Sequence, residues 1–119
     1  MAEPTRPQKV LPGVLQTARS FRLRLRGLMF RKAWPKKWNG LYFPECSAIH
    51  TFFTWVEFEL VFLDVHHRVT RLEAGPRPWR FYKGPSGTID TLELPMGTQQ
   101  LLDLKVGDPM QWISLKTLE

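Results

Sequence analysis

Short β-forming segments separated by turn residues follow one another along almost the whole of this 119-residue sequence. Pro44 and Pro95 each end a segment, because proline cannot donate a hydrogen bond to a neighbouring strand, and Gly107-Asp108 introduces the last one. The expected strands are Val10–Thr17, Leu41–Phe43, Ala48–Leu63, Val69–Glu73, Thr88–Leu94 and Met110–Leu115, with a short helix at Thr98–Leu102. Such a series predicts a mainly β protein, either β-sandwich-like or an open barrel, with one or two short helices.

The segment Ala48–Leu63 carries the strongest β signal. Its apolar side chains recur at every second position from Val56 to Phe62, and Glu57 and Glu59 occupy positions between them. This alternation predicts a central strand with one face on the core and the two acids on the solvent face. Acids two residues apart lie about 6 to 7 Å apart at Cα, which also suits a pair of catalytic carboxylates. We favour the solvent-face interpretation.

Two periodicities compete in the segment Ser20–Arg31. Phe21, Leu23 and Leu25 alternate with arginines, as in a strand, whereas Phe21, Leu25 and Leu28 recur at helical spacing. The local pattern leaves both a strand and a helix open.

Chain length and cysteine content bound the class of protein. The length suits one domain with one hydrophobic core, and we expect a flexible N-terminal tail at residues 1–9 and a single β-rich domain at 10–119. Cys46 is the only cysteine, so no intramolecular disulfide can form. The sequence contains no apolar run of the length of a signal peptide or a membrane span. These features predict a reducing, cytoplasmic location.

Positive charge is concentrated in the first forty residues, which carry ten Lys or Arg against the single acid Glu3. The remaining residues carry seven basic and ten acidic side chains. A basic block of this kind attracts polyanions, but it also serves as a solvated surface. Because it contains none of the known nucleic-acid motifs, we favour a solvated surface and expect nucleic-acid binding to be at most weak and non-specific.

Six short blocks resemble, in the same order, those of an uncharacterised bacterial and archaeal family, domain of unknown function 192. The blocks are Arg26–Arg31, Ile49–Phe52, Val61–Asp64, Pro78–Arg80, Leu92–Pro95 and Lys105–Asp108. The resemblance implies a compact β-sandwich-like domain and favours a short helix within Ser20–Arg31. It brings no established activity, because the family is itself uncharacterised.

This sequence departs from the family pattern at positions that bear on function. After His50-Thr51 the family usually has a small residue, then Met, then Pro and Asp, and this chain has Phe53, Thr54, Glu57 and Glu59. At the turn after Asp64, where the family commonly has Gly, His67 must accept a positive φ angle.

Catalytic and metal-binding arrangements are weak in this sequence. Cys46 and His50 are the residue types of a thiolate-imidazole pair, but on extended backbone they lie well over about 10 Å apart. A packed cysteine beside a hydrogen-bonded histidine is the preferred interpretation. His66 and His67 point to opposite sides in extended structure, so we expect exposed turn residues, no metal site and no cofactor.

The most attractive candidate is a binding site built from the residues shared with the family. The candidates are Arg26, His50, Thr51 and Glu59, with Trp55 or Trp79 as an aromatic wall. They would offer a cation, an imidazole, a hydroxyl and a carboxylate, and small-ligand pockets combine a few such polar groups with apolar walls. The leading hypothesis is a non-catalytic module that binds a small polar or carbohydrate-like ligand.

Three alternatives stay open at this point. Arg26 and Glu59 could form an internal ion pair that fastens a helix to the sheet, with Trp79 covering its edge. A hydrolase-type enzyme could use His50 with Glu59 or Cys46. The basic N-terminal segment could bind a polyanion weakly. The sequence does not predict the oligomeric state.

Overall fold

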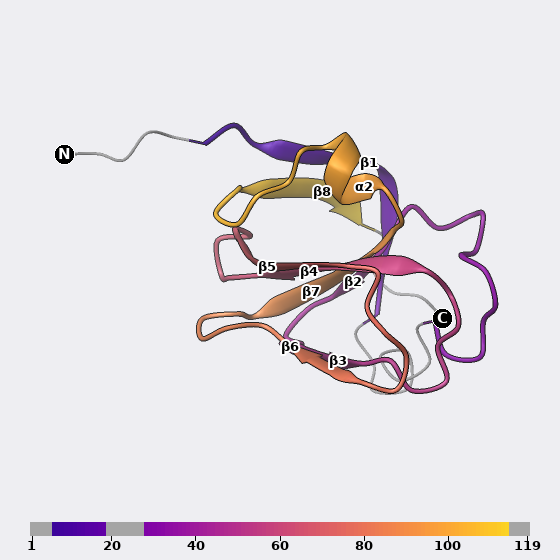
Figure 1. Ribbon diagram of the computed structural model, residues 1–119. Helices are drawn as coiled ribbons and strands as arrows, with labels where there is room; N and C mark the ends of the chain where they lie inside the picture. The colour runs from indigo at the N-terminus through magenta and orange to yellow at the C-terminus, as the bar shows by residue number, and fades with distance from the viewer. Residues whose placement is uncertain (1–5, 19–27, 115–119) are drawn as a thin grey trace.

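The computed structural model describes residues 6–18 and 28–114 (Figure 1). Within these residues the chain forms eight strands and one short helix. They are β1 (Lys9–Thr17), β2 (Leu41–Phe43), β3 (Ala48–His50), β4 (Phe58–Leu63), β5 (Val69–Ala74), β6 (Phe81–Lys83), β7 (Asp90–Pro95), α2 (Thr98–Leu101) and β8 (Met110–Ser114). The helix in this part of the chain lacks the length and apolar character needed to cross a membrane.

Six of the strands form one curled sheet in the order β5-β4-β7-β2-β1-β8. β1 runs parallel to both β2 and β8, and the other pairs in this sheet are antiparallel. β1 and β8 fold over β4, β5 and β7, and the β3–β6 pair forms a separate layer below them (Figure 1). The expectation of a mainly β, open-barrel-like fold with a short helix is confirmed.

The curled sheet buries apolar side chains on both of its faces. The first core, enclosed by the curl, contains Leu11, Leu15, Val61, Leu63, Val69, Leu92, Leu94, Leu104 and Met110. The second core, between the sheet and the β3–β6 layer, contains Ala18, Leu28, Leu41, Phe43, Ile49, Val56, Phe58, Leu60 and Phe62. Because β4 lies between the two cores, all six of its residues are buried.

This double coverage overturns two expectations drawn from the segment Ala48–Leu63. The segment is not one strand: it forms β3 and β4, joined by a loop at residues 51–57. Glu59 is not on a solvent face, because its Cα partner Leu94 belongs to the first core and α2 lies over it. Glu57 precedes β4 and is exposed.

Local turn chemistry explains several of the element boundaries. His67 adopts a φ angle of 58°, so the expected left-handed backbone at this turn is confirmed. β1 is bent around Gly13 at φ 72° and lies between β2 and β8 in the sheet. The competing helix and strand at Ser20–Arg31 lie largely outside the described residues. Residues 1–5 of the expected N-terminal tail also lie outside them, and Arg6 donates to Asp108 at 3.3 Å.

Candidate functional site

The two-stranded layer of β3 and β6 has an inner and an outer face. Ile49 pairs with Tyr82, and both pack on the second core. The neighbouring pair, His50 and Phe81, therefore points outward, since side chains alternate along a strand. His50, one of the predicted site residues, thus lies on the outer face of this layer.

Thr51 ties the loop after β3 to the loop before β6. Its hydroxyl donates to the Arg77 carbonyl at 2.6 Å and accepts the Arg80 amide at 2.9 Å. Its carbonyl accepts the Trp79 amide at 3.1 Å. Thr51 is itself buried, so it fixes the backbone that carries Trp79 and does not face solvent.

Six aromatic side chains from three segments form a continuous surface on this side of the molecule, which we call the aromatic strip. Its members are Trp55, Phe30, Phe53, Trp79, Phe52 and Phe81, in spatial order. Successive ring centroids lie 6.4, 5.1, 4.7, 5.8 and 5.0 Å apart. The His50 ring extends the strip, 5.4 Å from that of Phe52.

Most of the aromatic strip is open to solvent. Phe81 is 73% exposed, Phe30 63%, Trp55 53%, Trp79 49% and Phe53 39%. Single exposed apolar residues are ordinary in proteins, but contiguous exposed patches mark interaction sites. The strip is therefore the strongest candidate for a binding surface among the described residues.

The backbone is strained at three positions of the aromatic strip. Phe30, Phe53 and Trp79 have φ angles of 62°, 59° and 61°. A left-handed conformation is a true outlier for a bulky residue and costs about 1 to 3 kcal/mol, and such outliers cluster at functional sites. The Phe30 amide donates to the Phe53 carbonyl at 2.7 Å, which holds two of these residues together.

His50 presents a hydrogen-bond donor at one end of the aromatic strip. Its Nδ1 accepts the Phe52 amide at 3.2 Å, and partial burial lowers the pKa of the imidazole. A neutral ring with Nδ1 as acceptor carries its proton on Nε2. His50 therefore combines an apolar ring face with one donor.

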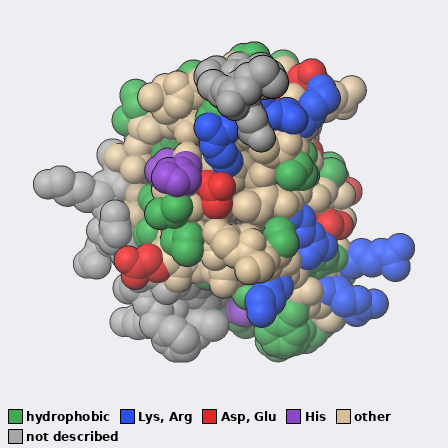
Figure 2. All heavy atoms as spheres, turned by 90° about the vertical axis from the view of Figure 1, so that its left-hand side faces the viewer, with side chains coloured by type: hydrophobic (Ala, Val, Ile, Leu, Met, Phe, Trp, Pro, Cys, Tyr) green, Lys and Arg blue, Asp and Glu red, His purple; other side chains and the backbone are tan. Residues whose placement is uncertain are grey.

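Basic side chains outnumber acids around the aromatic strip. The three segments that carry it, residues 28–34, 50–57 and 77–83, contain Arg31, Lys32, Arg77, Arg80 and Lys83 against the single acid Glu57. Arg80 lies beside the strip, because its guanidinium donates to the Trp79 carbonyl at 3.3 Å. Figure 2 shows hydrophobic side chains with Lys or Arg beside them at its lower edge, the level at which β3 and β6 lie.

Glu59 does not join the other predicted site residues. Its carboxylate accepts the Gly97 amide at 3.0 Å and the Gln99 amide at 2.8 Å, which anchors α2 to β4. It faces the first core, whereas His50, Thr51 and Trp79 lie beyond the second core. Arg26, the remaining candidate, lies outside the described residues.

The thiol and the other histidines are also engaged elsewhere. Cys46 is half-buried, packs on the second core and donates to the Ala48 carbonyl at 3.2 Å. His66 is exposed, but His67 is half-buried, 3.5 Å from the Asp90 carboxylate and with its ring 4.6 Å from that of Trp112. Across residues 6–18 and 28–114 no three His, Cys, Asp or Glu side chains gather as they would around a metal ion.

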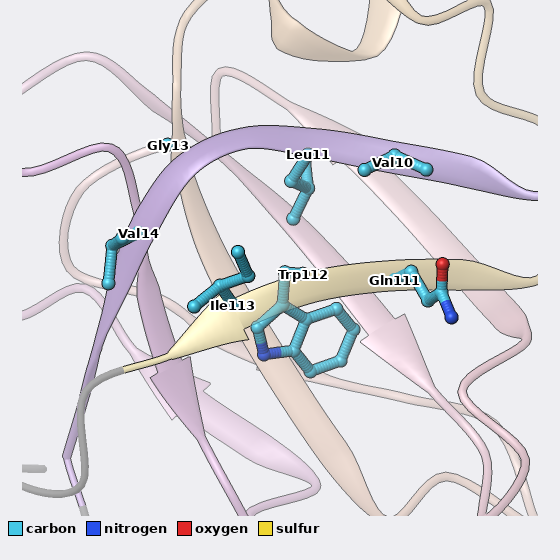
Figure 3. A pocket seen from close by; sticks show the side chains of 7 residues that line it. All are labelled: Val10, Leu11, Gly13, Val14, Gln111, Trp112 and Ile113. Atoms are coloured by element: carbon cyan, nitrogen blue, oxygen red, sulfur yellow. The ribbon is translucent and has the colours of Figure 1, made fainter.

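A concavity of about 550 Å³ lies between β1 and β8, away from the aromatic strip (Figure 3). The register of the β1–β8 pairing shifts between Val10 and Val14, because the three residues Leu11–Gly13 lie opposite the single residue Trp112. β1 arches away from β8 at this point (Figure 3). Its lining is apolar apart from Gln111 and backbone, and none of the predicted site residues lies there.

Sequence reasoning missed Phe30, Phe52, Phe53 and Phe81 as site residues. The available signal was the adjacent pair Phe52-Phe53, which breaks the alternation expected of a strand buried on one face. The loop between β3 and β4 and the meeting of three distant segments on one surface cannot be predicted from the local sequence pattern.

Comparisons with known proteins give the family and the fold. The family model of domain of unknown function 192 (DUF192), described as "Uncharacterized ACR", matches residues 5–112. A UPF0127 protein of Thermococcus sibiricus is 34% identical over 110 residues, covering 87% of this chain and 69% of that protein. A UPF0127 protein of Pyrococcus horikoshii is 29% identical over 106 residues, covering 86% of this chain and 90% of that protein.

Two crystal structures share the fold. A protein of unknown function from Novosphingobium aromaticivorans superposes with a TM-score of 0.66 at 24% identity, covering 78% of this chain and 70% of that one. A putative transcription regulator from Sinorhizobium meliloti gives a TM-score of 0.68 at 19% identity, covering 80% and 78%. At identities this low, the likeness shows a common fold alone. The family match over residues 5–112 and the resemblance to the archaeal relatives show that this chain belongs to the DUF192 family of uncharacterised proteins.

Proposed function

We propose that this protein is a non-catalytic module that binds a carbohydrate-like ligand on the aromatic strip. The observation that carries the proposal is the contiguity of six aromatic rings, five of them at least 39% exposed. Small-ligand sites combine apolar and aromatic walls with a few polar groups that fix orientation. A sugar ring has apolar C–H faces that pack flat on aromatic rings and hydroxyl groups at its rim.

Polar groups along the strip suit the rim of such a ligand. His50 offers its Nε2 proton, and the exposed guanidinium groups of Arg77 and Arg80 offer several more donors. The left-handed backbone at Phe30, Phe53 and Trp79 supports the proposal, because strain of this kind is retained where it presents a side chain for function.

The positions of the polar groups favour binding over hydrolysis. A hydrolase would need His50 within hydrogen-bond reach of Glu59 or Cys46. Glu59 instead binds the start of α2 on the far side of the sheet, and the Cys46 thiol donates to a backbone carbonyl. A cytoplasmic location is part of the proposal and rests on the single cysteine.

A second candidate function is weak binding of a single-stranded nucleic acid. The observation that favours it is the excess of basic side chains around the strip, since aromatic platforms flanked by cations bind single strands by stacking. We expect a dissociation constant of about 10⁻⁴ to 10⁻⁶ M at physiological salt, with affinity falling steeply as salt rises. Nanomolar binding at about 0.15 M salt would make this the leading function.

The proposal is tested by measuring the binding of a panel of neutral and acidic oligosaccharides to the protein. Binding is monitored by tryptophan fluorescence and by calorimetry. Trp79→Ala and Phe81→Ala should each weaken binding about tenfold or more, whereas Leu101→Ala, which removes an exposed apolar side chain on α2, should leave it unchanged. Sedimentation of the same variants tests self-association. A dimer that Trp79→Ala dissociates would assign the strip to a subunit interface and refute ligand binding.

A further inference from the structure

We infer that the ligand of the aromatic strip is an acidic oligosaccharide, a chain of several sugar units that carries carboxylate groups. The inference rests on the proposed function and adds the ligand's length and charge.

The extent of the strip indicates more than one sugar unit. Between Trp55 at one end and Phe81 at the other lie four further rings, with every successive pair of centroids 4.7 to 6.4 Å apart. One sugar ring is about the size of one aromatic ring, so a monosaccharide would leave most of the exposed surface uncovered. An oligosaccharide would cover it.

The charges beside the strip indicate an acidic ligand. Arg77, Arg80 and Lys83 are all exposed on or next to β6, and Glu57 is the only acid in the strip's own segments. Lys83 shares the outer face of β6 with Phe81, because the two residues are separated by one position. Arginine binds carboxylates in a bidentate manner, which adds both orientation and affinity.

Ring spacing leaves no room for nucleic-acid bases inserted between the rings. A base inserted between two aromatic rings needs about twice the 3.4 Å rise of stacked nucleotides, or about 7 Å. All neighbouring centroids in the strip are closer than this, and the Phe53–Trp79 and Phe52–Phe81 pairs meet edge to face at 66° and 73°. The strip is thus a closed surface across which a ligand lies and not a series of slots.

The experiment compares tetragalacturonate, the neutral tetramer maltotetraose, monomeric galacturonate and a thymidine decanucleotide by calorimetry at about 0.05 M and about 0.3 M salt. We expect tetragalacturonate to bind at least fivefold more tightly than maltotetraose and far more tightly than the monomer, with the preference shrinking at high salt. Arg80→Ala should lower tetragalacturonate affinity about tenfold and maltotetraose affinity by no more than about threefold, because the neutral tetramer loses a hydrogen-bond donor but no charge partner. Trp79→Ala should weaken both. Arg68→Ala, which removes an exposed cation at the β4–β5 turn, is the matched control.

The possible results separate the inference from the proposed function. Equal affinity for the acidic and neutral tetramers, or equal affinity for monomer and tetramer, would overturn the inference and leave the proposed function standing. An equal loss in Arg68→Ala and Arg80→Ala would show diffuse charge attraction and would also overturn it. Binding of the decanucleotide without binding of any saccharide would overturn both, as would the lack of binding to all four probes.

Discussion

Glu93 is expected to make the stability of this protein fall as the pH rises above the ordinary range of a glutamate. Its side chain enters the second core from β7, between its Cα partners Leu41 and Leu60. It is 5% exposed, and its Oε1 has no hydrogen-bond partner among the described residues. Burial raises the pKa of Glu93 to about 8, because the charged form would lose its hydration.

The sign and size of the effect follow from proton linkage. In the unfolded chain this carboxyl loses its proton near 4.5, whereas in the folded protein it keeps the proton up to about 8. Between these values the unfolded state binds fewer protons, so the contribution to stability is complete below about pH 4.5 and is lost as the pH passes through 8. At about 1.4 kcal/mol for each pH unit, the loss is about 3 to 5 kcal/mol, a large share of the 5 to 15 kcal/mol typical of a domain.

The assay is urea unfolding between about pH 5 and about pH 8.5, for the wild type, Glu93→Gln and the exposed control Glu57→Gln. Glu93→Gln cannot ionise, so its free energy of unfolding should change less with pH than that of the wild type. The difference should move the urea midpoint by about 1 M or more, since m is about 1 to 3 kcal/mol/M. Parallel pH profiles for the wild type and Glu93→Gln would refute the reasoning and show that the folded protein holds Glu93 ionised with a charge partner.

Four further outcomes are expected. Glu59→Ala should destabilise the fold by about 2 to 4 kcal/mol in urea unfolding, because two backbone amides at α2 lose a charged acceptor; a change below about 0.5 kcal/mol would contradict this role. Trp79→Gly should be more stable than Trp79→Ala by about 1 kcal/mol, since only glycine relieves the left-handed backbone, and the reverse order would argue against strain. His50→Ala should cost about 1 kcal/mol, the value of one hydrogen bond to the Phe52 amide, and an unchanged urea midpoint would count against that bond. A thiol reagent should label half-buried Cys46 at least about tenfold more slowly in the folded than in the unfolded protein, and equal rates would show an accessible, reactive thiol.

Local sequence chemistry predicted most of the elements of the fold. Proline and glycine turns placed β2, β5, β7 and β8 to within a few residues, and Gly97 placed the start of α2. The backbone at His67 was also predictable, because a tight turn requires a left-handed residue whatever the rest of the chain does. These features depend on the φ preferences and hydrogen-bonding capacity of a few adjacent residues, which the sequence contains in full.

The burial of the acids was decided by tertiary structure. Alternation along Ala48–Leu63 predicts a strand with one solvent face, but a pattern of period two reports only that neighbouring side chains point to opposite sides. Whether the second side meets water depends on what packs there. The curl of the sheet brings α2 over Glu59, and the β3–β6 layer encloses the side of β7 that carries Glu93.

The aromatic strip likewise exists only in the folded chain. The sequence contains its rings, and sequence patterns singled out His50, Thr51 and Trp79. Phe30 and Phe81, however, are fifty-one positions apart. They lie on one surface because β3 pairs with β6 and Thr51 binds the loop before β6. Hydrophobic burial alone would draw such rings inward. They stay outside because the second core is already filled by Ile49, Val56 and their neighbours, and this competition for interior space is settled by the packing of the whole molecule.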